Sequence, residues 1–359
     1  MNRVILIGNG FDLAQDLRTS YKNFIDDYWD KKSDEIVKMV HYNISMHYGT
    51  IPLKPYEDND IVVELTNNSS FHDNIVNGAT GFDRFSFLVS RFQNIRGKEN
   101  LNIKNKFLHY ITSNRRLQNW VDIEEEYYKS LKICLDTEDP RSVKALHKEF
   151  DSLQIALEEY LTRQTNINNQ KAEIIYQKIY YPLTLGSKWV GDERYDKLLF
   201  LNFNYTNNIK LNHSLHSHSK LIHIHGELNN PENPMIFGYG DELDEKYKFI
   251  EQLNDNEYLK NMKSIKYLQA RKYHELLAFI DSDDYQIFIM GHSCGISDRT
   301  LLNKLFEHKN CRSIKPFYHQ KKGGVDNYTD LTINISRNFN DKSLFRERVV
   351  NKLDCEPLL

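Results

Sequence analysis

The sequence predicts an α/β protein in which a mainly parallel sheet, with helices on both faces, is split by a large helical insertion. Short apolar and β-branched runs occur at the start of the chain and again after residue 195, with helix-like segments between several of them. Such alternation is typical of parallel sheets, because each parallel connection needs a crossover. The region between is charged and mostly helical in pattern. We therefore expect residues 1–30 and 196–359 to form the core and residues 31–195 to form the insertion.

Composition limits the class of protein. A chain of 359 residues can bury a substantial core and hold two domains. The net charge of −3 creates no general attraction for nucleic acid or a membrane surface. The first apolar run is too short for a signal peptide, and no stretch approaches membrane-spanning length. We therefore expect no membrane partner. None of the four cysteines forms a C-x-x-C pair, so we expect a cytoplasmic protein without disulfides.

Seven short runs are expected to form strands, because they are rich in β-branched and aromatic residues and are bounded by turn residues. They are Val4–Ile7, Leu198–Asn204, Leu221–His225, Met235–Phe237, Gln286–Met290, Ile314–Tyr318 and Leu331–Ile335.

Helices are expected where apolar residues recur every three or four positions. The first begins near Tyr21, with Thr19 or Ser20 as its N-cap. The clearest helix lies in the insertion, and another helical stretch covers about residues 241–281. A segment near residues 58–81 is rich in Asn, Asp and Gly and is expected to be a loop. One face of the clearest helix carries Val143, Leu146, Phe150, Leu153, Leu157, Tyr160 and Leu161.

Two glycines directly after the first strand are the most informative feature of the chain. The turn is Gly8-Asn9-Gly10-Phe11-Asp12, and we expect these five residues to bind a nucleotide. Glycine lets the backbone approach an anion with its N–H groups pointing at it. Asp12 would repel phosphate, so a ribose hydroxyl is its natural partner. The turn lacks the third glycine of the dinucleotide fingerprint, and a plain tight turn beside a core strand is the alternative.

Polar residues end the next two strands. Asn202 and Asn204 share one face, which indicates either a binding role or a cap of the following turn. His225 stands before a glycine at a strand end, where an imidazole is well placed for proton transfer. A buried histidine satisfied by its neighbours is the alternative. A zinc site is a further alternative at this strand end, but no third ligand follows at a set spacing, and we expect no metal. Its histidines would be His213, His216, His218, His223 and His225.

A third strand end combines small residues with a histidine, in Gly291-His292-Ser293-Cys294-Gly295. The string is similar to the nucleophile elbow G-x-S-x-G, with Ser293 as nucleophile and His308 or His319 as a later base. Nothing in the sequence marks either histidine. We therefore interpret Gly291 and Ser293 as a second backbone approach to the nucleotide.

Together these motifs resemble the AbiH-type abortive-infection proteins of bacterial anti-phage defence. The similar segments run in order over nearly the whole chain. They are Gly8–Asp12, Trp120–Glu124, Phe203–Thr206, His225-Gly226 and Gly291–Asp298. The resemblance implies a role in abortive infection.

That family in turn is similar to the sirtuin-like NAD-binding proteins. The resemblance implies a Rossmann-like core, NAD as ligand or substrate, and Asn204 and His225 as the catalytic pair. It also implies that Gly291 and Ser293 contact the cofactor and that Asn334 lies near the adenosine ribose. The zinc cysteines of true sirtuins are missing, so protein deacylation is not expected.

The resulting hypothesis is an NAD glycohydrolase that depletes NAD on infection. A silent enzyme of this kind implies a phage-derived trigger and a homo-oligomer or an accessory defence protein. Two other classes stay open. One is a nucleotide-binding sensor without catalysis. The other is a metal-dependent nuclease or phosphohydrolase that uses His223, His225 and Asp298.

Overall fold

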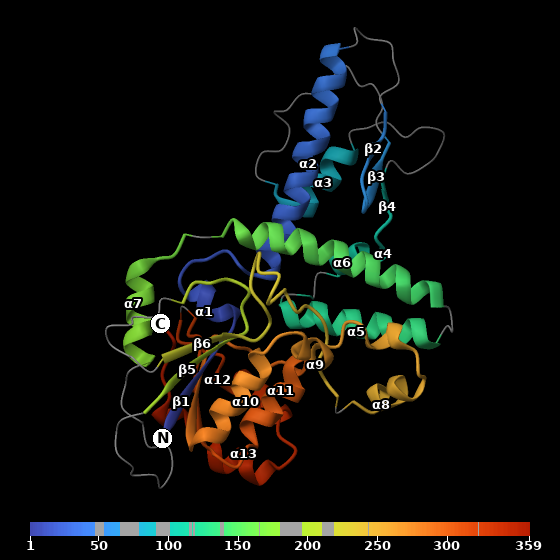
Figure 1. The fold of residues 1–359 in the computed structure, drawn as a ribbon. Helices are drawn as coiled ribbons and strands as arrows, with labels where there is room; N and C mark the ends of the chain where they lie inside the picture. The colour runs from blue at the N-terminus through green and yellow to red at the C-terminus, as the bar shows by residue number, and fades with distance from the viewer. Residues whose placement is uncertain are drawn as a thin grey trace. The chain divides into compact units, whose positions relative to one another are not determined.

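The chain folds into two compact units in the computed structural model (Figure 1). The sheet unit consists of Met1–Thr19 and Leu161–Leu359, and the helical unit of Ser20–Tyr160. The boundaries differ from the expected 30/31 and 195/196, because the first long helix belongs wholly to the helical unit and a helix at 169–179 packs on the sheet. The structure describes residues 1–46, 54–64, 79–90, 101–114, 117, 119–136, 140–164, 166–179, 196–209, 219–242, 244–321 and 323–359.

The described strands of the sheet unit are all parallel, which confirms the predicted α/β architecture. Their order across the sheet is β6-β5-β1-β7-β8. The chain therefore adds strands on one side of β1 and then returns to its other side, so the order reverses between β1 and β7. All carboxyl ends lie at one edge. The strands are β1 (Asn2–Ile7), β5 (Leu198–Asn202), β6 (Ser219–His223), β7 (Tyr285–Met290) and β8 (Cys311–Phe317).

Helices cover both faces of this sheet, as predicted. Val4 and Leu6 of β1 belong to one apolar cluster, which includes buried residues of α10 (Lys272–Ser282), α11 (Arg299–Phe306) and α12 (Tyr328–Arg337). Ile5 and Ile7 belong to a second cluster on the opposite face. It contains residues of α1 (Asn9–Ala14) and α7 (Asn169–Ile179). Alternate side chains of one buried strand thus supply two cores.

The expected helical stretch between β6 and β7 is confirmed, and the C-terminal part adds further helices. Besides α10, the helices between β6 and β7 are α8 (Glu245–Gln252), η2 (Asn256–Leu259), α9 (Lys263–Lys266) and η3 (Tyr267–Gln269). The further helices after β7 are η4 (Ile296–Asp298), α13 (Lys342–Arg348) and η5 (Lys352–Asp354).

Two predicted strands are wrong. Leu331–Ile335 lies in helix α12, where Leu331 and Ile335 are buried one helical turn apart and Ile333 is 46% exposed. The same residues fit an alternating pattern, but the helical spacing decides the structure. Met235–Phe237 is outside any strand. It lies between Pro234 and Gly238, and Gly238 approaches the chain so closely that a Cβ would lie 2.1 Å from the carbonyl oxygen of Asn261.

The helical unit contains the predicted long helices. Ser20 caps α2, because its Oγ accepts a hydrogen bond from the N–H of Asn23 at 3.1 Å. The apolar face predicted over residues 143–161 is buried on α6. The described helices are α2 (Tyr21–Met46), α3 (Gly81–Ser90), α4 (Lys106–Ser113), α5 (Trp120–Asp136) and α6 (Pro140–Thr162).

A small antiparallel sheet in the helical unit was not expected from the sequence. It consists of β2 (Tyr56–Glu57), β3 (Ile61–Val63) and β4 (Leu101–Ile103). The loop expected over residues 58–81 therefore contains β3, while residues 65–78 lie outside the described residues. Strands of two or three residues carry too little alternation to be recognised in a sequence.

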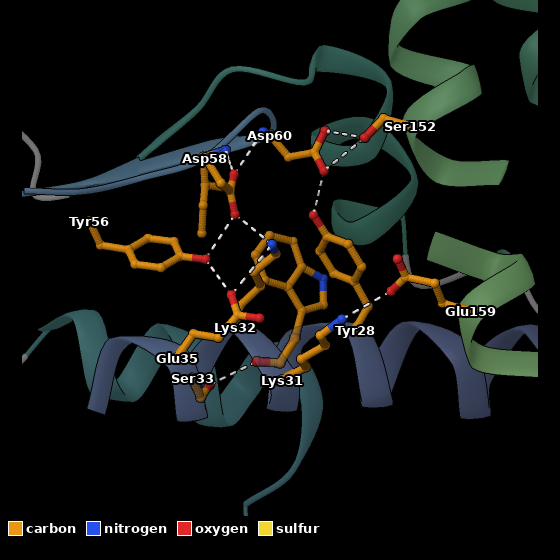
Figure 2. A network of polar contacts seen from close by, with 12 residues as sticks. Tyr28, Lys31, Lys32, Ser33, Glu35, Tyr56, Asp58, Asp60, Ser152 and Glu159 are labelled. Atoms are coloured by element: carbon orange, nitrogen blue, oxygen red, sulfur yellow. Dashed lines mark hydrogen bonds and ion pairs between the residues drawn. The ribbon is translucent and has the colours of Figure 1, made fainter. Parts of the chain in front are cut away.

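Carboxylates fix the hairpin between β2 and β3 (Figure 2). Asp58 Oδ1 accepts the backbone N–H groups of Asp60 and Ile61, each at 2.8 Å, which closes the turn. The buried Asp60 carboxylate accepts hydroxyl hydrogen bonds from Tyr28 of α2 and Ser152 of α6. The turn is therefore tied to two helices by hydrogen bonds.

Within the described part of the chain, every helix is either too short or too polar to cross a lipid bilayer.

Candidate functional site

The two glycine-containing turns meet where the strand order reverses. The Gly10 N–H donates to the Gly291 carbonyl at 2.8 Å. Gly291 has a φ of +77°, and a Cβ at this position would lie 2.0 Å from the backbone nitrogen of Phe11. A Cβ on Gly8 would lie 2.6 Å from the Cα of His292. Glycine is therefore required by the close approach of one backbone to the other.

The predicted phosphate-binding N–H groups have partners inside the chain. Besides the bond from Gly10, the Gly8 N–H points to the Met290 carbonyl at 3.4 Å. The neighbouring Asn9 side chain accepts a hydrogen bond from the Thr19 hydroxyl at 2.6 Å, and Phe11 is fully buried. These contacts give the turn a packing role. Its binding of a nucleotide stays a prediction.

Asp12 is a buried carboxyl group at the same edge of the sheet. Its Oδ2 accepts a hydrogen bond from the Thr206 hydroxyl at 2.6 Å. Burial raises the pKa of Asp12 to about 7, although hydrogen bonds from Thr206, Asn208 and Asn204 act in the opposite direction. Near neutral pH the group is therefore present in both its protonated and its ionised form, and the protonated form can donate a hydrogen bond.

Asn202 and Asn204 have different surroundings. The Asn202 amide donates to the carbonyl of Thr206 at 3.1 Å, and its oxygen accepts the N–H of Asn204 at 3.0 Å. This is the turn-capping role weighed as the alternative. Asn204 instead reaches across the edge of the sheet, where its amide donates to the Gly8 carbonyl at 3.0 Å. Asn204 thus links the end of β5 to the end of β1.

His225 lies in a buried polar cluster, which we name the His225 cluster and define as His225, Lys263, Tyr267, His292 and Asp298. Nε2 of His225 is 3.1 Å from Oδ1 of Asp298 and 3.1 Å from the Tyr267 hydroxyl. The Lys263 ammonium lies 2.8 Å from the same Oδ1, and Nε2 of His292 lies 3.5 Å from Oδ2. Every member has an exposed fraction of 6% or less.

The charges in this cluster are set by burial and by the ion pair. Lys263, His225 and His292 hold the pKa of the Asp298 carboxyl well below its usual range against the effect of burial. Burial and the Lys263 charge lower the pKa of His225 to about 4, although Asp298 acts in the opposite direction. At neutral pH the cluster therefore contains a carboxylate, an ammonium and a neutral His225.

The turn after β7 is held in place from α12. The Asn334 amide donates to the Ser293 carbonyl at 3.0 Å, and the Asn338 amide donates to the Cys294 carbonyl at 2.8 Å. Ser293 is exposed, and Cys294 has a φ of +54°. The structure thus gives Asn334 a loop-supporting contact. Its predicted proximity to a ribose remains untested.

Most of the predicted site residues come together at the carboxyl edge. Phe203 packs against the His225 cluster, because its ring centroid lies 5.0 Å from that of His225 and 4.2 Å from that of His292. Sequence reasoning missed Lys263 and Tyr267, which come from short helices. No local pattern marks them, because Lys263 is buried by residues distant in the sequence, such as Gly240, where a Cβ would lie 3.2 Å from the Lys263 side chain.

The described residues form no cluster that could bind a metal ion. Among them, no three His, Cys, Asp or Glu side chains are grouped to hold an ion. His213, His216 and His218 lie outside the described residues. At Asp298, the Lys263 ammonium occupies the position of a cation.

The protein is an α/β protein with a parallel sheet, and the strand order of this sheet reverses between two glycine turns. A buried polar cluster lies at the carboxyl edge, which is therefore the candidate site. The family model described as "Bacteriophage abortive infection AbiH" matches residues 4–319, and the chain belongs to this family. Its role is therefore in abortive infection against bacteriophage, as the sequence motifs predicted. No curated protein and no solved structure matches the chain.

The Asp12 carboxyl predicts a specific pH dependence of stability. Its pKa is about 7 in the fold and is raised from 3.8, so the folded chain binds more protons between pH 4 and 7, and stability falls as pH rises through this range. Asp12→Asn cannot ionise. We expect its free energy of unfolding, relative to the natural chain, to rise by about 2–3 kcal/mol from pH 5 to pH 8. Denaturant titrations at both pH values measure this.

The matched control for that measurement is Asp16→Asn. Asp16 is an exposed carboxylate on the same segment, and hydrogen bonds from Lys171 and Asn168 lower its pKa. It does not titrate between pH 5 and 8, so this variant should keep the pH dependence of the natural chain. Equal pH dependence in all three proteins would refute the assignment of a raised pKa to Asp12.

Proposed function

We propose that this abortive-infection protein binds NAD, or a related nucleotide, at the carboxyl edge of a Rossmann-like, sirtuin-like sheet and hydrolyses its nicotinamide–ribose bond. The observation that carries the proposal is a neutral, buried His225 that shares the Asp298 carboxylate with His292, the residue directly after Gly291, where the strand order reverses. In open α/β sheets, ligands bind outside the carboxyl ends of the strands at such a point.

The proposed reaction uses water as the nucleophile. Its oxygen attacks C1′ of the ribose as the C1′–N bond breaks, nicotinamide leaves with the bonding electron pair, and ADP-ribose forms. An oxocarbenium-like transition state needs little help from a strong base, so a weakly basic imidazole can accept the water proton late in the reaction. Asn204 would orient the ribose or the water, because its amide is already fixed against Gly8. Asp12 would bind a ribose hydroxyl.

Loss of the two proposed catalytic side chains should abolish turnover. We expect His225→Ala and Asn204→Ala each to lower nicotinamide release from NAD by about a hundredfold or more. His319→Ala serves as the matched control, because His319 is exposed and should be dispensable. Activity should survive a chelator. Full activity in both variants, with folding intact, would exclude this assignment.

A sensor without catalysis is the second candidate, and the closed glycine turns favour it. The Gly10–Gly291 hydrogen bond joins the two turns, so the backbone spans the point where the strand order reverses. A protein of this kind would bind NAD or ADP-ribose in a calorimeter and release no nicotinamide. In either case a phage-derived trigger would open the site, alone or through a homo-oligomer or an accessory defence protein.

A further inference from the structure

The Asp298 carboxylate is shared by three side chains from different parts of the sheet unit. Lys263 comes from α9, His225 follows β6, and His292 follows β7. Lys263 and His225 approach the same oxygen, at 2.8 Å and 3.1 Å, and His292 approaches the other at 3.5 Å. One buried carboxylate therefore fixes the positions of all three groups.

Hydrogen-bonding rules fix where the proton of His225 resides. Nε2 of His225 lies 3.1 Å from both Asp298 Oδ1 and the Tyr267 hydroxyl oxygen. An ionised carboxylate only accepts hydrogen bonds, which places the proton on Nε2, and the Tyr267 oxygen then faces this N–H as a second acceptor. A neutral imidazole holds one ring proton, which leaves Nδ1 bare. His292 follows the same rule. Its Nδ1 accepts the N–H of Cys294 at 3.0 Å, so its proton is also on the nitrogen that faces Asp298.

Burial and the neighbouring Lys263 together keep His225 uncharged. A carboxylate beside a histidine ordinarily favours the imidazolium form, as in a Ser-His-Asp triad. Here the ammonium neutralises the carboxylate and repels a second positive charge. The other titratable groups that face His225 are Tyr267, Tyr205 and His292, and none of them is an anion at neutral pH. Burial opposes the charged ring further, which lowers the pKa of His225 to about 4.

We propose that Asp298 and Lys263 are paired positioning residues, which hold His225 as a neutral ring with its proton on Nε2 and a bare Nδ1 that accepts a hydrogen bond from a ligand hydroxyl. Asp298 sets the tautomer, and Lys263 together with burial keeps the ring uncharged. The ligand class that fits such a nitrogen is a hydroxyl donor, such as water or a ribose hydroxyl. The role in catalysis rests on the proposed function, but the tautomer and the charge do not.

Nitrogen NMR of the full-length protein with ¹⁵N-labelled histidine tests this directly, and His225→Gln assigns the signals. The natural chain should show His225 with a protonated Nε2 and a bare Nδ1 at every pH from 5.5 to 8. A protonated Nδ1, or a ring that becomes charged with a midpoint near its ordinary value of about 6.5, would overturn the proposal.

Two variants separate positioning from packing. Lys263→Met should move the titration midpoint of His225 upward by more than about one pH unit, because Asp298 then acts unopposed. Lys263→Arg, which keeps the charge, should restore a neutral ring at pH 6. Arg that fails to restore it, or Met that leaves the midpoint unchanged, would exclude Lys263 as a determinant.

If Lys263→Met does not fold, the spectra of the natural chain and of Lys263→Arg still decide the question. Nicotinamide release is measured separately on the same samples. A correct tautomer without release would refute only the proposed function. Release with a charged or wrongly protonated His225 would refute the positioning role and the use of His225 as proton acceptor, but not the hydrolysis of NAD.

Discussion

Lys263→Met is expected to lower the free energy of unfolding by about 3–5 kcal/mol. The Lys263 side chain is 1% exposed, and its ammonium lies 2.8 Å from the Asp298 carboxylate, which is 6% exposed. Removing the ammonium leaves a buried carboxylate without its cation. The cost of that unpaired charge exceeds the cost of the missing contact itself, and the apolar volume of Met recovers only the packing of the lysine stem. Urea titration at pH 7 measures the effect.

The matched control is an ion pair with the same separation at the surface. Lys352 also lies 2.8 Å from its partner, Asp326, but its side chain is 50% exposed. Lys352→Met should therefore cost no more than about 1 kcal/mol. Similar losses in both variants would contradict the view that burial of Asp298 makes Lys263 essential.

A second comparison separates the ion pair from its surroundings. Replacing both partners, as Lys263→Met with Asp298→Leu, removes the two charges together. The double variant should be more stable than Lys263→Met alone, because a buried ion pair contributes little beyond the cost of leaving one half unpaired. Its His225 would lose both the tautomer-fixing acceptor and the repelling cation. We therefore expect this variant to recover stability while the tautomer and the charge of His225 change.

The strand ends of the sheet unit were predictable because each apolar run stops at a residue with a clear local reason. β1 and β7 end directly before Gly8 and Gly291, as expected. β5 and β6 end at Asn202 and His223, two residues before the expected ends at Asn204 and His225. Parallel strands place these ends at one edge, so the proximity of Asn204 to Gly8 also followed from the sequence. Local pattern and tertiary structure agree at these positions.

Lys263 could not be predicted in the same way. It stands in a charged helical stretch, where a lysine is ordinarily solvated. Its burial depends on Gly240 and Asp298, which are distant in the sequence and approach it only in the folded chain. The strand expected at 331–335 failed for a related reason, since the apolar core under α12 selects a helical over an alternating pattern. Tertiary packing decided both cases.

Gly291→Ala is expected to destabilise the sheet unit by about 3–5 kcal/mol, as the sum of backbone strain and steric overlap. The residue has a φ of +77°, and the added Cβ would lie 2.0 Å from the Phe11 nitrogen and 2.5 Å from the Gly10 carbonyl carbon. These obstacles are backbone atoms, which cannot rotate away as a side chain can. The two turns must therefore separate, and the Gly10–Gly291 hydrogen bond must break. Urea titration again gives the free energy.

Gly323→Ala isolates the conformational part of this cost. Gly323 also has a positive φ, +96°, but a Cβ there meets nothing within 4 Å. We expect a loss of about 1–2 kcal/mol from backbone strain alone. A loss of the same size for Gly291→Ala would mean that the turns tolerate separation. Because the turns meet where the strand order reverses, that result would favour a site that opens without a trigger, whereas the larger loss would favour turns that stay closed in the isolated chain.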